Sequence, residues 1–164
     1  MPMKRIALVL SFTVAGAISA NAQPTMVKQF EDWGVYSYSK GGETVCYLLT
    51  GPTTKQPASV DHGSNFFVIG RAPSAGYEPQ AIMGYELKPG SRVKVAIGDK
   101  TFTMFTRGKS AWVLEASREP DVISAMRSGS DMTVEAVSQR GTATTYTYSL
   151  NGVTAALKRV ASCN

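Results

Sequence analysis

A hairpin pattern in the stretch RVKVAIGDKTFTMF constrains the fold more than any other feature of the chain. A two-residue loop at Gly98-Asp99 places Val95 opposite Phe102 and Val93 opposite Met104. One side of the resulting pair is then apolar and the other is polar. Because a one-residue slip would move every side chain to the other face, this register predicts two antiparallel strands with one buried face.

Two further hairpins follow from the same reasoning. In MTVEAVSQRGTATTYTYS a three-residue loop that ends at Gly141 pairs Val134 with Tyr146, whereas a two-residue loop mixes the faces. Glycine suits the left-handed third position of such a loop. A loop at Gly41-Gly42 pairs Tyr36 with Tyr47, and both faces of this hairpin carry apolar residues. We therefore expect that hairpin to be central and covered on each side.

The remaining pattern completes a prediction of the fold. Two more strands are expected at residues 64–70 and 81–87, with a loop over residues 73–79 between them. One helix is expected after a cap at Ser117, with Pro120 in its first turn and Gly129 at its end. A second helix is expected to begin at Ser149 or Asn151, because apolar residues recur there at spacings of three and four. We predict a mainly β fold, an antiparallel β-sandwich or barrel-like domain built from hairpins, with two short helices, the second at the C-terminus.

The first 22 residues have the pattern of a cleaved signal peptide. Lys4 and Arg5 precede an apolar stretch over residues 6–17 that is too short to span a bilayer, and a small-x-small site ends at Ala22. We predict cleavage after Ala22, a single β-rich domain over residues 23–164, and a location in the periplasm or outside the cell. No later stretch approaches 18 apolar residues, so no transmembrane segment is expected in the mature chain.

The charge pattern argues against a nucleic-acid partner. Without Lys4 and Arg5 the chain keeps 15 basic and 12 acidic residues, and its formal charge falls from +5 to +3. Basic residues form no run and do not alternate with aromatic ones as in a single-strand binder. An ordinary solvated surface accounts for this distribution.

Cys46 and Cys163 are the two cysteines of the chain. Cys163 continues the apolar stripe of the C-terminal helix, and Cys46 lies in a predicted strand. Two cysteines in one exported domain usually pair, so we predict a disulfide that fixes the end of the chain to an early strand. A redox-active pair is the alternative, although no C-x-x-C spacing supports it.

No residue set for catalysis, metal binding or cofactor binding emerges from the sequence. The chain contains no G-x-S-x-G elbow, phosphate-binding loop, EF-hand loop or H-E-x-x-H motif. His62, the single histidine, lies in the segment DHGSN, which reads as a turn, and one histidine cannot make a histidine-based zinc site. We predict no catalytic residues, no metal and no cofactor.

Five aromatic residues are candidates for an interaction surface, namely Trp33, Tyr36, Trp112, Tyr146 and Tyr148. Exposed aromatic side chains often dominate binding energy at protein interfaces. Each tryptophan also lies in or beside an apolar strand pattern, which fits a place in the core.

An ordered set of blocks resembles the invasion-associated locus B family of exported bacterial proteins. The blocks run through nearly all of the mature chain: FEDWGVYS, VCYLL, FFVIGRAPSAG, MGYELKPGS, FTMFTRGKSAWV, AMRSGSDMTV and RGTATTYTYSLNGVTAAL. Cys46 and Cys163 match positions where the family carries cysteines. Glu31 departs from the pattern, since glycine is more typical before Asp-Trp. Ser37 and Tyr38 stand where some relatives carry another cysteine.

The resemblance implies a periplasmic or secreted protein of a Gram-negative bacterium, associated in pathogens with entry into host cells. It brings no catalytic residues. We expect a non-enzymatic binding protein whose partner is a protein or a component of the envelope or host surface. The alternatives are a periplasmic hydrolase of cell-envelope material with a site near His62, an envelope-maintenance protein, and a redox or folding accessory.

Overall fold

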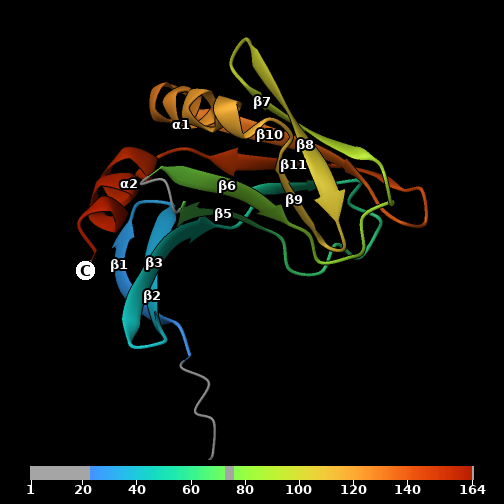
Figure 1. The fold of residues 1–164 in the computed structure, drawn as a ribbon. Coiled ribbons are helices and arrows are strands. Elements are labelled where there is room, and N and C mark those ends of the chain that lie inside the picture. The colour runs from blue at the N-terminus through green and yellow to red at the C-terminus, as the bar shows by residue number, and fades with distance from the viewer. Residues whose placement is uncertain (1–22, 73–75, 164) are drawn as a thin grey trace, which may run out of the picture.

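The computed structural model describes residues 23–72 and 76–163, so the predicted signal peptide lies outside the described residues. The described chain is mainly β, with two α-helices and one short 3-10 helix, as Figure 1 shows. The elements are β1 Thr25–Phe30, β2 Trp33–Lys40, β3 Glu43–Thr50, β4 Thr54–Gln56, β5 Phe66–Arg71, β6 Tyr77–Ile82, β7 Arg92–Ile97, β8 Lys100–Arg107, β9 Ser110–Val113, η1 Ala116–Arg118, α1 Glu119–Ser128, β10 Asp131–Val137, β11 Ala143–Ser149 and α2 Val153–Ala161.

The strands form a single antiparallel sheet in the order β1-β2-β3-β5-β6-β9-β8-β7-β10-β11-β4. The sheet curls strongly. Five strands separate β5, which carries Phe67, from β11, which carries Tyr148, yet the ring centroids of these two residues are 6.0 Å apart. The Nε1 of Trp33 in β2 donates a hydrogen bond to the carbonyl of Ser149 in β11 at 3.1 Å. The two halves of the sheet therefore face each other across one core.

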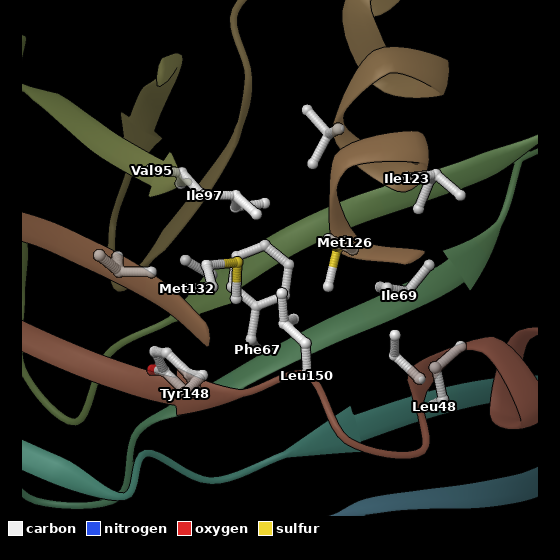
Figure 2. Close-up of a cluster of buried hydrophobic side chains, with 14 of the residues drawn as sticks. Leu48, Phe67, Ile69, Val95, Ile97, Ile123, Met126, Met132, Tyr148 and Leu150 are labelled. Carbon is white, nitrogen blue, oxygen red and sulfur yellow. The ribbon is translucent and has the colours of Figure 1, made fainter. Parts of the chain in front are cut away.

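This core fills the inner face of the curled sheet. Figure 2 shows Ile123 and Met126 of α1 pointing toward the side chains of Phe67, Ile69 and Met132. Figure 1 shows α2 beside β1, β2 and β3, which it contacts through its own buried apolar stripe. The inner face is thus covered by both helices and by the opposite half of the sheet.

All three predicted hairpins are confirmed in register. Val95 lies opposite Phe102, Val134 opposite Tyr146, and Tyr36 opposite Tyr47. The loop glycines carry the expected left-handed backbone, with φ of 87° at Gly141. Alternation fixes these registers locally, which is why the sequence could predict them.

Several sequence expectations need correction. The strand expected at residues 81–87 is β6, which begins earlier, at Tyr77, ends at Ile82 and includes Pro79. The residues of β6 that pair with β9 are Gln80, Ala81 and Ile82. Because Pro79 lies outside this paired stretch, its missing N–H removes no hydrogen bond between β6 and β9. The second face of the β2–β3 pair, expected to be covered, is half-buried.

The helices begin later than expected. The residue before α1 is Arg118, which provides no side-chain cap, and Ser117 lies in η1. Pro120 does occupy the first turn of α1, and Gly129 follows its last residue. The helix α2 begins after Gly152, whose φ is 89°. A Cβ at Gly152 would collide with the carbonyl of Phe30, so this position accepts no side chain.

The predicted disulfide is confirmed. Cys46 of β3 and Cys163, just after α2, are bonded, with 6.2 Å between their Cα atoms and 117 residues between them in sequence. The bond fixes the C-terminal end of α2 to the third strand. Cys46 is almost completely buried.

Candidate functional site

The structure separates the five aromatic residues that the sequence offered as an interaction surface. Trp33, Tyr146 and Tyr148 are completely buried on the inner face, so the prediction is wrong for these three. Tyr36 and Trp112 are half-buried and both lie on the outer face of the sheet. The alternation of Tyr146 and Tyr148 with threonines indicated a buried face and could have excluded them.

A row of uncharged side chains crosses the outer face of five neighbouring strands. Leu49 of β3 lies beside Val68 of β5, Val68 beside Gln80 of β6, Gln80 beside Trp112 of β9, and Trp112 beside Phe105 of β8. All five side chains are half-buried. We call these residues the outer row.

Aromatic pairs extend the outer row. The rings of Phe105 and Trp112 stack with their centroids 5.8 Å apart. Next to Leu49, Tyr36 and Tyr47 stack at 5.7 Å, and Tyr38 meets Tyr47 edge-on at 6.1 Å. Burial raises the pKa of Tyr47, and the neighbouring Tyr36 and Tyr38 raise it further. The outer row and these three tyrosines together form the outer aromatic face.

The other half of the same sheet surface has a different character. On β7, β10 and β11 the outward positions carry threonines and charges. Lys94 and Glu135 form an exposed ion pair at 2.9 Å, and Thr133 and Thr145 lie beside it in the register. The large half-buried apolar side chains of this surface lie mainly on β2, β3, β5, β6, β8 and β9, and the exposed Met26 of β1 lies beside Tyr36.

A hollow of about 370 Å³ opens at the end of the outer row, beside Phe105 and Trp112. Glu78, Glu119 and Arg107 are among the residues that line it. Burial raises the pKa of Glu119, and the neighbouring carboxylate of Glu78 raises it further. Charged groups thus border the uncharged row at this end.

A second hollow, which we call the His62 pocket, has a volume of about 430 Å³. A chain of hydrogen bonds supports its floor. His62 Nε2 lies 2.8 Å from the carbonyl oxygen of Pro57, and Nδ1 lies 2.8 Å from the Tyr146 hydroxyl. The Tyr146 hydroxyl lies 3.1 Å from that of Tyr85, which lies 2.6 Å from Thr144 Oγ1. The last contact runs from Thr144 to the carbonyl of Ala136 at 3.3 Å.

Each of the five contacts in this hydrogen-bond chain needs one hydrogen atom. Five hydrogen bonds link four side chains and two carbonyls, and a carbonyl can only accept. With neutral His62 the four side chains supply four protons, so one contact lacks a hydrogen. A protonated His62 supplies the fifth. In either state both ring nitrogens of His62 already have partners within the protein.

The loop that carries His62 is held by close backbone contacts. The Asn65 side-chain amide donates to the carbonyl of His62 at 2.9 Å and accepts from the backbone N–H of Gly84 at 3.1 Å. A Cβ at Gly84 would lie 2.6 Å from the backbone nitrogen of Ser64. The sequence prediction of a turn histidine missed the burial of His62, which is only 7% exposed.

We expect the protein to lose stability in alkaline solution because of Tyr146 and Tyr148. Burial is the main cause that raises the pKa of both hydroxyls above the ordinary value of 10.0. Above pH 10 the unfolded chain releases these protons while the folded chain keeps them, so the free energy of unfolding falls as pH rises. Each tyrosine contributes a slope of about 1.4 kcal/mol per pH unit until its folded-state pKa is reached.

Urea denaturation between pH 9 and pH 11.5 measures this slope. Tyr148→Phe should make the slope shallower, because it removes one of the two titrating hydroxyls. The Tyr148 hydroxyl makes no hydrogen bond in the described structure, so the substitution removes no other interaction of that group. Phe67→Leu, beside Tyr148 on the inner face, removes no titrating group and is the matched control; it should leave the slope unchanged. An equal slope in the wild type and in Tyr148→Phe would contradict the prediction.

Two further observations bear on function. Within residues 23–72 and 76–163, no group of three or more His, Cys, Asp or Glu side chains is placed to hold a metal ion. None of the helices in the described part of the chain has the length and apolar character needed to cross a membrane.

Comparison with known proteins points to one family. The model of the family described as "Invasion associated locus B (IalB) protein" matches residues 33–161. No curated protein matches the chain significantly. Among solved structures, the crystal structure of invasion-associated protein B from Bartonella henselae is similar, with a TM-score of 0.62 and 13% sequence identity over 83% of this chain and 95% of that chain. At this identity the likeness supports the fold alone.

Proposed function

Because this chain belongs to the invasion-associated locus B family, we propose that it is an exported, non-enzymatic binding protein that docks a partner protein on the outer aromatic face. The proposed role is in association with host cells, in line with the name of the family and of the similar Bartonella protein. The observation that carries the proposal is the outer row, an uncharged strip of half-buried side chains across five neighbouring strands.

The composition of this face favours a protein partner. The cores of protein interfaces are rich in Tyr, Trp and Phe and poor in charge, and polar residues surround them. The outer row has no charged residue, while Glu78, Arg107, Lys40 and Glu43 lie at the margins of the outer aromatic face. Neither a nucleic acid nor an anionic surface would be matched by an uncharged aromatic strip.

Export is supported by two features. Residues 1–22 have the pattern of a signal peptide. The Cys46–Cys163 disulfide suits an oxidising compartment, because thiols in the cytosol are kept reduced. We therefore propose a periplasmic or secreted location for the mature chain.

The alternative of a hydrolase with a site near His62 is weakened by the geometry there. A general base must direct a free lone pair toward the substrate proton. The Nδ1 and Nε2 of His62 are held by Tyr146 and Pro57, so His62 would have to lose one of these contacts before it could act.

A double substitution, Tyr36→Ala with Trp112→Ala, tests the role of the outer aromatic face. Aromatic residues at the centre of an interface each contribute about 2 kcal/mol or more, so we expect partner binding to weaken by about 100-fold or more. In the bacterium that encodes the chain, entry into cultured host cells should then fall to the level of a strain that lacks the gene.

The matched control is Thr133→Ala with Thr145→Ala, on the polar half of the same sheet surface. At an equal level of exported protein, a strain with this control variant should enter host cells as well as the wild type. Detergent sensitivity of the strains is measured as well, because a role in envelope maintenance would make the deletion strain more sensitive. Normal entry by the deletion strain would overturn the proposed role. If sedimentation shows a dimer that the double substitution dissociates, the partner on this face is a second copy of the chain.

A further inference from the structure

The His62 pocket is a second site, distinct from the outer aromatic face and independent of the function proposed above. Its walls come from three separate segments: the loop at residues 60–62, Tyr85 with Glu86, and the turn between β10 and β11. Its volume of about 430 Å³ lies within the range of small-molecule sites.

Hydrogen bonds hold the floor of the pocket in place. Tyr85, Thr144 and His62 are fixed by the hydrogen-bond chain that ends at the carbonyls of Pro57 and Ala136. These polar atoms are used within the protein, so the floor presents a fixed shape rather than free polar groups. A preorganised floor lowers the entropic cost of binding a ligand.

The wall carries the groups that remain free. Asp61, Glu86, Gln139 and Arg140 line the pocket, and each ends in a planar group with at least two polar atoms in one plane. In the described structure, the side chains of Glu86, Gln139 and Arg140 make neither a hydrogen bond nor an ion pair with other residues. One oxygen of Asp61 accepts from the backbone N–H of Gly63 at 2.9 Å, which leaves the other oxygen available.

The chemistry of this wall selects among ligands. Two carboxylates and one guanidinium complement neither a simple anion nor a simple cation. A ligand whose neighbouring hydroxyls both donate and accept can use paired oxygens, an amide and a guanidinium together. The Tyr85 ring and Val60 add apolar surface for carbon-bound hydrogens. We propose that the His62 pocket binds a small polyhydroxylated ligand, a mono- or disaccharide.

Saturation-transfer NMR on the purified, disulfide-bonded chain tests this proposal. The probes are glucose, galactose, N-acetylglucosamine and maltose, with glycine, glutamate and lysine as zwitterionic comparisons. We expect saturable transfer from at least one saccharide at concentrations up to about 10 mM. Glu86→Ala with Arg140→Ala should weaken that binding by about 10-fold or more, because two charge-assisted contacts are removed.

Both substituted side chains are exposed and make no bond within the described protein, so folding should be preserved and a thermal melt verifies it. Glu115→Ala with Arg127→Ala, two exposed charges away from the pocket, is the matched control and should bind like the wild type. The proposal is overturned if no saccharide binds, if binding survives the pocket substitutions, or if only the amino acids bind.

Discussion

Replacing Cys163 by serine is expected to lower the free energy of unfolding by about 4 to 5 kcal/mol. The disulfide joins residues 117 positions apart, and the chain-entropy model assigns a large stabilisation to the closure of a loop of that length. The bond also fixes the end of α2, which packs on β1, β2 and β3. Guanidinium denaturation of the oxidised wild type and of the variant, followed by tryptophan fluorescence, measures the difference.

The control for this prediction is the double variant Cys46→Ser with Cys163→Ser. It should match the wild type under full reduction, because in both cases the loop is open. A reduced wild type that unfolds within about 1 kcal/mol of the oxidised protein would show that the bond contributes little.

Replacing Trp33 by alanine is expected to cost about 3 to 5 kcal/mol, the second-largest effect. The side chain is completely buried and donates a hydrogen bond to the Ser149 carbonyl across the core. Its removal would leave a large cavity where β2 meets β11 and would orphan that carbonyl.

Trp112→Ala is the natural comparison, because Trp112 is half-buried on the outer face and makes no side-chain hydrogen bond in the described residues. Its loss should cost less than half as much in the same denaturation experiment. Equal losses for the two tryptophans would contradict the assignment of one to the core and the other to a surface.

The two tryptophans also show what the sequence could and could not predict. Hairpin registers followed from alternation and loop glycines, because those signals are local. Which aromatic residues face solvent depends on how the sheet curls, and no local pattern contains that information. Before the structure placed it, the apolar pattern around Trp33 favoured the core, and an interaction surface was the alternative.

The weakly patterned elements were missed for a related reason. The strand β1, TMVKQF, is mostly exposed, lies at the edge of the sheet and follows no clean alternation. The His62 pocket combines three segments that are distant in sequence, so only tertiary structure brings them together. The family pattern did contain one signal for the turn between β1 and β2. Glu31 stands where glycine is usual in the family, and it is the one non-glycine residue with positive φ in the described chain, at 48°.

The blocks that carry the family resemblance supply structural residues. In MGYELKPGS, Gly84 touches the His62 loop, Tyr85 joins the hydrogen-bond chain and Leu87 is buried. In the last block, Tyr148 and Leu150 are buried and Gly152 admits the carbonyl of Phe30. These residues of the two blocks therefore support the fold.

The long reach of the disulfide has a consequence for how the protein matures. Because synthesis begins at the N-terminus, Cys46 is made 117 residues before its partner. During that interval its thiol is open to oxidants, other thiols and folding catalysts. A chain that stops before residue 163 lacks Cys163 and cannot form the bond, so only molecules that extend to residue 163 are covalently closed.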